Sequence, residues 1–180
     1  MTRLSYSCLL SPRDLLALES ISVARWTNIE WAGADLVGAL RIRTSAVRIR
    51  GLTDVTIGVT PVDIQPKFEV FRLSASINAH KEDKDSRFRL IEFVAAGEVM
   101  SAFVGDNHQI LVGARLHPVP EWATDVVGTI IVEDLLVIRH STGQQAFITP
   151  DDSQLGALVV ARRKEEIAYP DSEIVYLRPL

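Results

Sequence analysis

Apolar residues in this chain form short runs that are rich in β-branched types and separated by polar residues and turn formers, a pattern typical of strands. In the first half, these runs predict strands at 20–26, 36–43, 46–50, 55–60 and 68–78. In the second half, they predict strands at 98–104, 109–116, 126–132, 135–140, 145–149, 157–162 and 173–178. Between two of these strands, Gly105, Asp106 and Asn107 predict a hairpin loop, because such residues tolerate positive φ. The pattern indicates a mainly β protein.

One segment near the N-terminus carries a helix start signal. Ser11 suits the N-cap, Pro12 suits the first turn, and Asp14 follows the cap by three residues. We expect the helix to end near Ser20. Its core-facing positions are Leu15, Leu16 and Leu18. The sequence therefore predicts one short N-terminal helix.

The two halves of the chain resemble each other. Residues 30–63 align with residues 121–152, and the identities include the sequence Glu-Trp-Ala at the start of each segment and Thr-Pro near its end. Because the identities keep one order at an offset of about 90 residues, we predict a tandem duplication of a β-sandwich or barrel-like unit. The first unit spans residues 1–92 and the second spans 93–180. The alternative is that two β-rich segments match through their composition alone.

Four arginines lie within the ten-residue segment RIRTSAVRIR, at Arg41, Arg43, Arg48 and Arg50. A turn or bulge at 44–46 would restore the alternation of buried and exposed side chains. With a two-residue loop at 44–45 the segment becomes a hairpin in which Arg41 faces Arg48. Like charges in that position destabilise a sheet by about 0.2–1 kcal/mol. We therefore expect solvent, acidic side chains, a partner protein or phosphates to offset the repulsion.

Charge is divided unevenly between the two predicted units. Residues 1–92 carry 13 basic and 11 acidic side chains, a net charge of +2, whereas residues 93–180 carry 6 and 12, a net charge of −6. We predict that the four arginines bind a partner or an anion and that acidic side chains of the second unit form a counter-surface, within the chain or between copies. The residues of this counter-surface are Glu133, Asp134, Asp151 and Asp152.

The composition and the apolar runs limit the class of protein and the compartment in which it occurs. A hydrophobic content of 47% over 180 residues is ample for a core, and the single cysteine, Cys8, excludes an internal disulfide and a cysteine-based zinc cluster. No apolar run approaches the roughly 20 residues of a membrane helix. The N-terminus lacks the apolar region of a cleaved signal peptide. We expect a protein of the cytoplasm, or of a particle assembled there, that does not contact membranes.

The sequence contains few candidates for catalytic or metal-binding residues. The four histidines lack metal-ligand spacing, and no phosphate-binding glycine loop or GxSxG motif occurs. The polar residues 106–108 are explained by a hairpin turn. We predict no catalytic residue, metal or cofactor. Our hypothesis is a non-enzymatic structural or adaptor subunit that acts through protein contacts or self-assembly in a larger assembly, such as a virion. The alternative is a module that binds nucleic acid or another polyanion through the four arginines, and an enzyme of unrecognised type ranks third.

Overall fold

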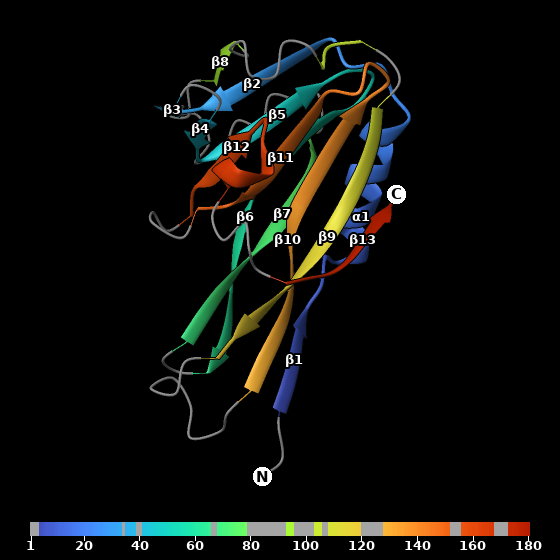
Figure 1. Ribbon diagram of the computed structural model, residues 1–180. Coiled ribbons are helices and arrows are strands. Elements are labelled where there is room, and N and C mark those ends of the chain that lie inside the picture. The colour runs from blue at the N-terminus through green and yellow to red at the C-terminus, as the bar shows by residue number, and fades with distance from the viewer. Residues whose placement is uncertain are drawn as a thin grey trace, which may run out of the picture.

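The computed structural model describes residues 4–33, 35–38, 41–65, 68–78, 93–95, 103–105, 108–119, 128–151, 156–167 and 173–180. Within them the protein is mainly β, as predicted, with one α-helix, α1 (Pro12–Ser22), and a short 3₁₀ helix, η3 (Lys164–Glu166) (Figure 1). The first strands are β1 (Leu4–Cys8), β2 (Asn28–Ala32), β3 (Asp35–Gly38), β4 (Arg41–Thr44), β5 (Ala46–Arg50), β6 (Asp54–Gln65) and β7 (Phe68–Asn78). The later strands are β8 (Phe93–Ala95), β9 (His108–Pro118), β10 (Gly128–His140), β11 (Gln145–Pro150), β12 (Leu158–Ala161) and β13 (Ile174–Pro179).

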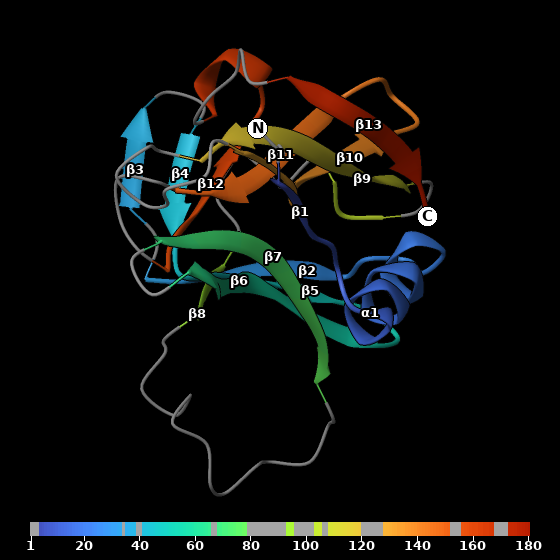
Figure 2. The same ribbon diagram turned by 90° about the horizontal axis from the view of Figure 1, so that it is seen from below.

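The described strands form two sheets. The larger sheet has eight strands, in the order β13-β9-β10-β11-β12-β4-β3, with β1 added in parallel beside β10. The smaller sheet has five strands, in the order β7-β6-β5-β2-β8. The sheets stack as two layers, and α1 lies at one side of the stack (Figure 2). The result is an open two-sheet arrangement rather than a closed barrel.

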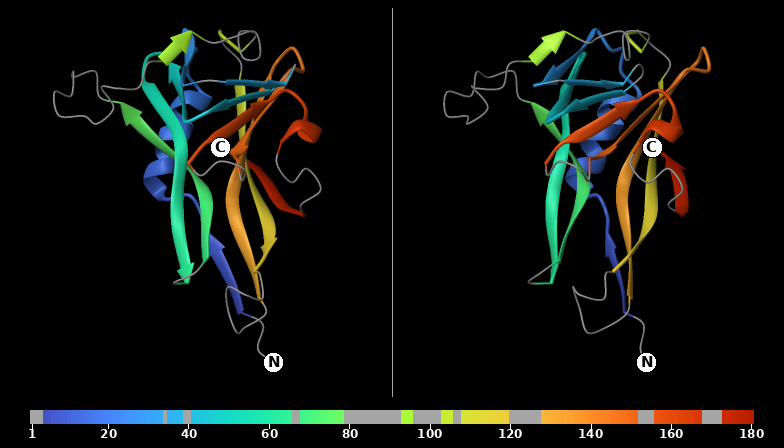
Figure 3. Two further views of the ribbon diagram at one scale, coloured as in Figure 1. Left: turned by 90° about the vertical axis from the view of Figure 1, so that its left-hand side faces the viewer. Right: turned by 60° about the vertical axis from the view of Figure 1, so that its left-hand side comes forward.

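The main core lies between the two sheets and draws on both halves of the sequence. Its fully buried side chains include Trp26 and Ile49 from the first half and Ile110 and Leu136 from the second. Trp31 is 2% exposed and lies between the sheets. A second cluster joins the long strands β6 and β7 to β1 and β10, which run side by side in Figure 3.

The helix begins as predicted. The Ser11 hydroxyl accepts a hydrogen bond from the Asp14 amide at 3.2 Å, and the Asp14 carboxylate accepts one from the Ser11 amide at 2.8 Å, which completes a capping box. The helix ends at Ser22 rather than near Ser20. The strand predicted at 20–26 is therefore wrong, because residues 20–22 belong to α1, Trp26 forms only an isolated bridge, and the next strand, β2, begins at Asn28. Leu16 is also not a core residue, since it is 60% exposed.

The predicted hairpin at 41–50 is wrong. β4 pairs with β3 and β12 in the larger sheet, whereas β5 pairs with β2 and β6 in the smaller one. The chain passes from one sheet to the other at Ser45. The Thr44 hydroxyl lies within hydrogen-bonding distance of two main-chain oxygens, that of Ala32 at 2.8 Å and that of Ala46 at 2.9 Å. The Ser45 amide donates to the Ala32 oxygen at 3.1 Å. The predicted change of phase does occur, because Ile42 and Thr44 are buried before the crossing and Val47 and Ile49 after it.

The second half also differs from its predicted strands. The runs 126–132 and 135–140 belong largely to one strand, β10, which continues through a bulge between Glu133 and Leu135. Gly105 has φ +124° and forms an isolated bridge with Trp26, and the rest of the predicted hairpin loop lies outside the described residues. Most of the predicted strand 98–104 and the predicted unit boundary at 92/93 also lie outside them. Strands from both halves occur in both sheets, and the duplication stays a prediction.

Asp14 ties α1 to β7 as well as capping the helix. Its carboxylate accepts a hydrogen bond from the Ala75 amide at 2.9 Å and an ion-paired hydrogen bond from Arg72 at 2.7 Å. Burial raises the pKa of Asp14, but the hydrogen bonds from Ser11, Ala75 and Arg72 outweigh it and hold that pKa below its usual value of 3.8. The charged carboxylate is therefore the form that the fold stabilises.

We expect Asp14→Asn to lower the free energy of unfolding by about 1–3 kcal/mol at neutral pH, because a charged acceptor of several hydrogen bonds is lost. Since the folded pKa is lowered, this contribution is present above the unfolded pKa of about 4 and disappears as the pH falls through the folded value. Urea denaturation of both proteins across this pH range measures the difference.

The matched control is Glu19→Gln, which removes a carboxylate from an exposed position of the same helix. It should change the unfolding free energy by less than about 0.5 kcal/mol. An Asp14→Asn difference that stays constant down to acid pH would contradict the assigned role of the charge.

Candidate interaction surface

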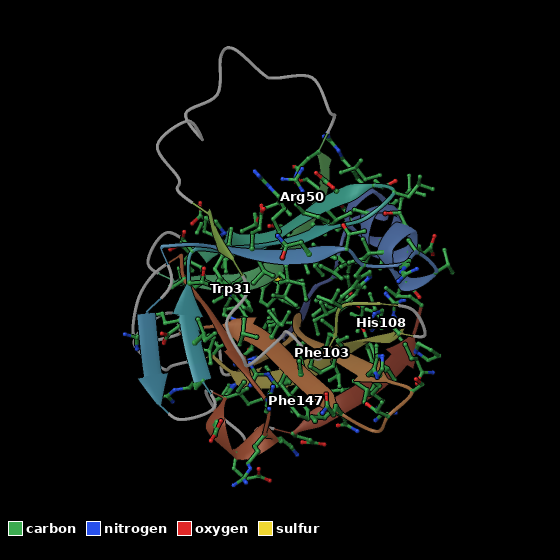
Figure 4. The ribbon with its side chains drawn as sticks, turned by 90° about the horizontal axis from the view of Figure 1, so that it is seen from above. Trp31, Arg50, Phe103, His108 and Phe147 are labelled. Atoms are coloured by element: carbon green, nitrogen blue, oxygen red, sulfur yellow. The ribbon has the colours of Figure 1, made fainter. Side chains whose placement is uncertain are left out.

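The four arginines of the segment 41–50 do not form one basic face. Arg41 and Arg43 extend from the face of β4 that carries their register partners Ala161 and Val159, away from the main core. Arg48 and Arg50 extend from the outer side of the five-stranded sheet, where Figure 4 labels Arg50. The sheet crossing at Ser45 thus sends the two pairs to different sheets.

The β5 pair meets acidic residues of its own half. Arg48 lies 3.7 Å from a carboxylate oxygen of Glu30, which is its register partner on β2. Arg50 lies 3.5 Å from the other oxygen of Glu30 and 3.3 Å from Asp54. Side chains as exposed as that of Arg50, at 41%, gain at most about 1 kcal/mol from such ion pairs. The repulsion expected from clustered arginines is offset locally.

The β4 pair meets the second half. Arg43 donates from Nε to the Asp151 carboxylate, which lies just beyond β11 and is 5% exposed. Arg41 donates to the main-chain oxygen of Glu166 in η3 at 3.3 Å. Of the predicted counter-surface, Asp151 is therefore brought against an arginine of the segment, and Asp152 lies outside the described residues.

Glu133 and Asp134 do not face these arginines in the part of the chain that the structure describes, so this part of the predicted counter-surface is wrong. Both residues are buried at the bulge of β10, at 1% and 3% exposure. Asp134 accepts hydrogen bonds from the Nε and Nη2 atoms of Arg115 at 2.8 and 2.9 Å and lies 2.8 Å from His117 Nε2. Buried carboxylates require nearby donors, and β9 supplies these two.

Glu133 is held by a different set of donors. Its Oε2 atom accepts a hydrogen bond from the Leu10 amide at 2.6 Å, and its Oε1 atom accepts from the Tyr176 hydroxyl at 2.6 Å and from Arg178 Nη2 at 3.0 Å. Ala114 is the register partner of both Glu133 and Tyr176, so its small side chain leaves room for this contact across β9. Burial, followed by the bond to Glu133 and its charge, raises the pKa of Tyr176 to about 12.

Exposed aliphatic side chains at one end of the molecule were not anticipated from the sequence. Val23 follows α1 and is 90% exposed, Leu52 lies in the turn after β5 and is 89% exposed, and Val104 is 42% exposed. We call these three residues the end surface. They lie outside helices and strands, whereas the apolar pattern predicted strands at 20–26, which includes Val23, and at 98–104, which includes Val104.

Backbone contacts around Trp26 fix the segments that carry the end surface. The amides of Trp26 and Gly105 each donate to the other residue's carbonyl, at 2.8 and 2.9 Å, and the Thr27 amide donates to the Arg50 carbonyl at 2.8 Å. A Cβ atom at Gly51 would lie 2.6 Å from the Arg25 oxygen, so the turn after β5 packs directly on the segment after α1.

The Trp26 side chain anchors this end from inside. It is fully buried, donates from its indole nitrogen to the Ile21 oxygen at 2.7 Å, and stacks on His108 with ring centroids 4.0 Å apart. The centroid of the His108 ring lies 5.3 Å from that of His140 and 6.5 Å from that of Phe103. Figure 4 labels His108 and Phe103. His108, which the sequence placed in a polar turn, is thus the first residue of β9 and part of an aromatic cluster.

Searches for related proteins do not identify a family. No family model, no curated protein and no solved structure matches the chain. Among the described residues, no group of three or more His, Cys, Asp or Glu side chains could hold a metal ion, and no helix is long and apolar enough to span a membrane. Cys8 is buried, and burial raises the pKa of its thiol.

We expect Tyr176→Phe to lower the free energy of unfolding by about 1 kcal/mol at neutral pH, because the Glu133 carboxylate loses a donor. Since the folded pKa of Tyr176 is raised, this contribution is present below the usual tyrosine pKa of about 10 and is lost as the pH rises through about 12. Ultraviolet titration of tyrosinate in both proteins should show one wild-type tyrosine that ionises near the higher value. Recovery of that same late transition in the Phe variant would refute the assignment.

Proposed function

We propose that the protein is a non-enzymatic structural or adaptor subunit that acts through protein contacts in a larger assembly, in the cytoplasm or within a particle assembled there. The observation that carries the proposal is the end surface, where two aliphatic side chains are about nine-tenths exposed, at 90% for Val23 and 89% for Leu52. Exposed aliphatic groups held in one place on fixed loops are typical of protein contact sites.

The rigidity of the supporting loops strengthens this proposal. The hydrogen bonds between Trp26, Gly105, Thr27 and Arg50 hold the end surface before any partner arrives. A preorganised surface loses little conformational entropy on association, so more of the burial energy is available for binding. Fully burying a valine or leucine contributes about 1.5–3 kcal/mol.

The charges favour an apolar contact over an ionic one. Arg43, Arg48 and Arg50 already meet carboxylates of the same chain. The ionic contact between a basic and an acidic half, expected from the sequence, would have to break these pairs. Contact through the end surface leaves them in place, and it should persist at high salt because ionic screening does not weaken apolar burial.

Self-assembly through the end surface is tested by size-exclusion chromatography with light scattering at low and high salt. We expect oligomers at both salt concentrations for the wild-type chain. Val23→Ser combined with Leu52→Ser should raise the dissociation constant by about tenfold or more for each residue, since each 1.4 kcal/mol of lost burial is a factor of ten.

Leu16→Ser is the matched control, because Leu16 is 60% exposed on α1 but lies outside the end surface. It should leave the oligomeric state unchanged. A chain that is monomeric at both salt concentrations argues against self-assembly, and an oligomer that dissociates at high salt argues for an ionic contact instead.

A polyanion-binding module remains the second proposal, and the partial exposure of Arg50, at 41%, is the observation in its favour. Phosphates would have to displace Glu30 and Asp54 from Arg50. If this function is correct, filter binding of DNA or RNA should weaken steeply with salt and should be reduced by Arg48→Ser with Arg50→Ser. Binding that this double variant leaves unchanged rules out the two arginines of β5 as the site.

The tandem duplication is also kept as a proposal. β5 and β6 form an antiparallel pair, as do β10 and β11, at aligned places in the two halves. In the alignment, Thr44 at the sheet crossing corresponds to Asp134 at the bulge of β10. An irregularity at the same aligned place supports a common origin of the units 1–92 and 93–180.

A further inference from the structure

A pocket of about 510 Å³ opens where the chain turns from β1 into α1, opposite the edge strand β13. Three leucines, Leu9, Leu10 and Leu15, line it together with Glu133, Tyr176 and Arg178. Its volume lies within the range of small-molecule sites, which are mostly apolar with a few fixed polar groups.

The acid in this pocket is already neutralised. Both Glu133 oxygens accept hydrogen bonds, from the Leu10 amide, the Tyr176 hydroxyl and the Arg178 guanidinium. Glu133 is 1% exposed, so another cation would have to displace one of these donors to reach it. The pocket therefore does not call for a cationic ligand.

The hydrogen bonds to Glu133 use only some of the N–H groups of Arg178. Its Nε and Nη2 atoms both bond to the same Glu133 oxygen, at 3.3 and 3.0 Å, and its side chain is 39% exposed. Within the described part of the chain, Nη1 makes no hydrogen bond. A guanidinium has five N–H groups, so Arg178 can hold a second anion while it keeps Glu133.

The pocket wall beside α1 is hydrocarbon. Leu9 is 49% exposed, and Leu15 is partly buried against the core. These side chains can bury an aliphatic chain, while Glu133 limits the charge of the ligand's head group. Because Glu133 and Arg178 already offset each other, a monoanion leaves one excess negative charge beside the buried carboxylate and a dianion leaves two, so charge repulsion favours the monoanion.

We propose that this pocket binds a small amphiphilic monocarboxylate, with its carboxylate on Arg178 and its aliphatic chain against Leu9 and Leu15. This binding does not depend on the proposed subunit contacts, because none of the end-surface residues lines the pocket.

Isothermal titration calorimetry with octanoate tests the proposal, with octylammonium and octyl phosphate as comparisons of the same chain length and different charge. Octanoate should bind with one-to-one stoichiometry at millimolar concentrations, and octylammonium should not bind. Octyl phosphate should bind more weakly than octanoate when it is doubly charged. Sedimentation with anionic phospholipid vesicles distinguishes a free ligand from a membrane surface, and the protein should stay in the supernatant.

Separate variants test the contact with the carboxylate of the ligand and the contact with its aliphatic chain. Leu9→Ser should raise the octanoate dissociation constant by about three- to tenfold, because half of that side chain is available for burial. Arg178→Gln should raise it by about tenfold or more, since a charge-assisted bond is lost. Arg178→Lys keeps the charge and should bind more tightly than the Gln variant, which guards against a loss of folding being read as a loss of binding.

The control is Leu177→Ser, on the opposite face of β13 at 36% exposure, and it should leave octanoate binding unchanged. Three results would overturn the proposal. These are no octanoate binding by the folded wild-type chain, equal binding of octanoate and octylammonium, or equal losses for Leu9→Ser and Leu177→Ser. Co-sedimentation with vesicles in place of octanoate binding would overturn it as well.

Discussion

The crossing of the chain at Ser45 determines how the two sheets are joined. The Ala32 carbonyl accepts hydrogen bonds from the Ser45 amide and from the Thr44 hydroxyl, at 3.1 and 2.8 Å. One nearly continuous extended segment can therefore leave the larger sheet as β4 and enter the smaller sheet as β5. Because Thr44 is 1% exposed, these bonds also satisfy polar groups that would otherwise be costly to bury. Ile42 before this junction and Val47 and Ile49 after it all enter the core between the sheets.

Three of the carboxylates that make the second half acidic lie inside the fold rather than on its surface. Glu133, Asp134 and Asp151 all belong to the acidic half, and all are buried with donors around them. Their charges are paired with donors inside the fold and contribute little to the electrostatic potential at the surface. Removing one partner of such a group is costly, because the other is left buried without compensation. The net charge of a half is therefore a poor guide to what its surface presents.

Local patterns predicted most of the strands and the start of the helix, and they failed at 20–26 and where the outcome depends on strand pairing. The capping signal at Ser11 and Asp14 located the start of the helix, and the change of phase at 44–46 followed from the side-chain pattern. The sheet that β5 joins could not be predicted in this way, because alternation of apolar and polar residues indicates which face of a strand is buried and not which strand pairs with it. Glu133 and Asp134 were likewise placed on a surface, since their donors Tyr176 and Arg115 are distant in sequence. The end surface and the pocket arise from loops that only the fold brings together.

Helix α1 lies between the pocket and the end surface. Leu15 near its start lines the pocket, and Val23 of the end surface follows its last residue. The 11 residues of the helix span about 16 Å, so a ligand in the pocket does not reach the end surface directly. Asp14 fixes the pocket end of the helix to β7 through Ala75 and Arg72. Because Trp26 fixes the other end through Ile21, the helix is held at both ends, and occupation of the pocket should leave the end surface in place.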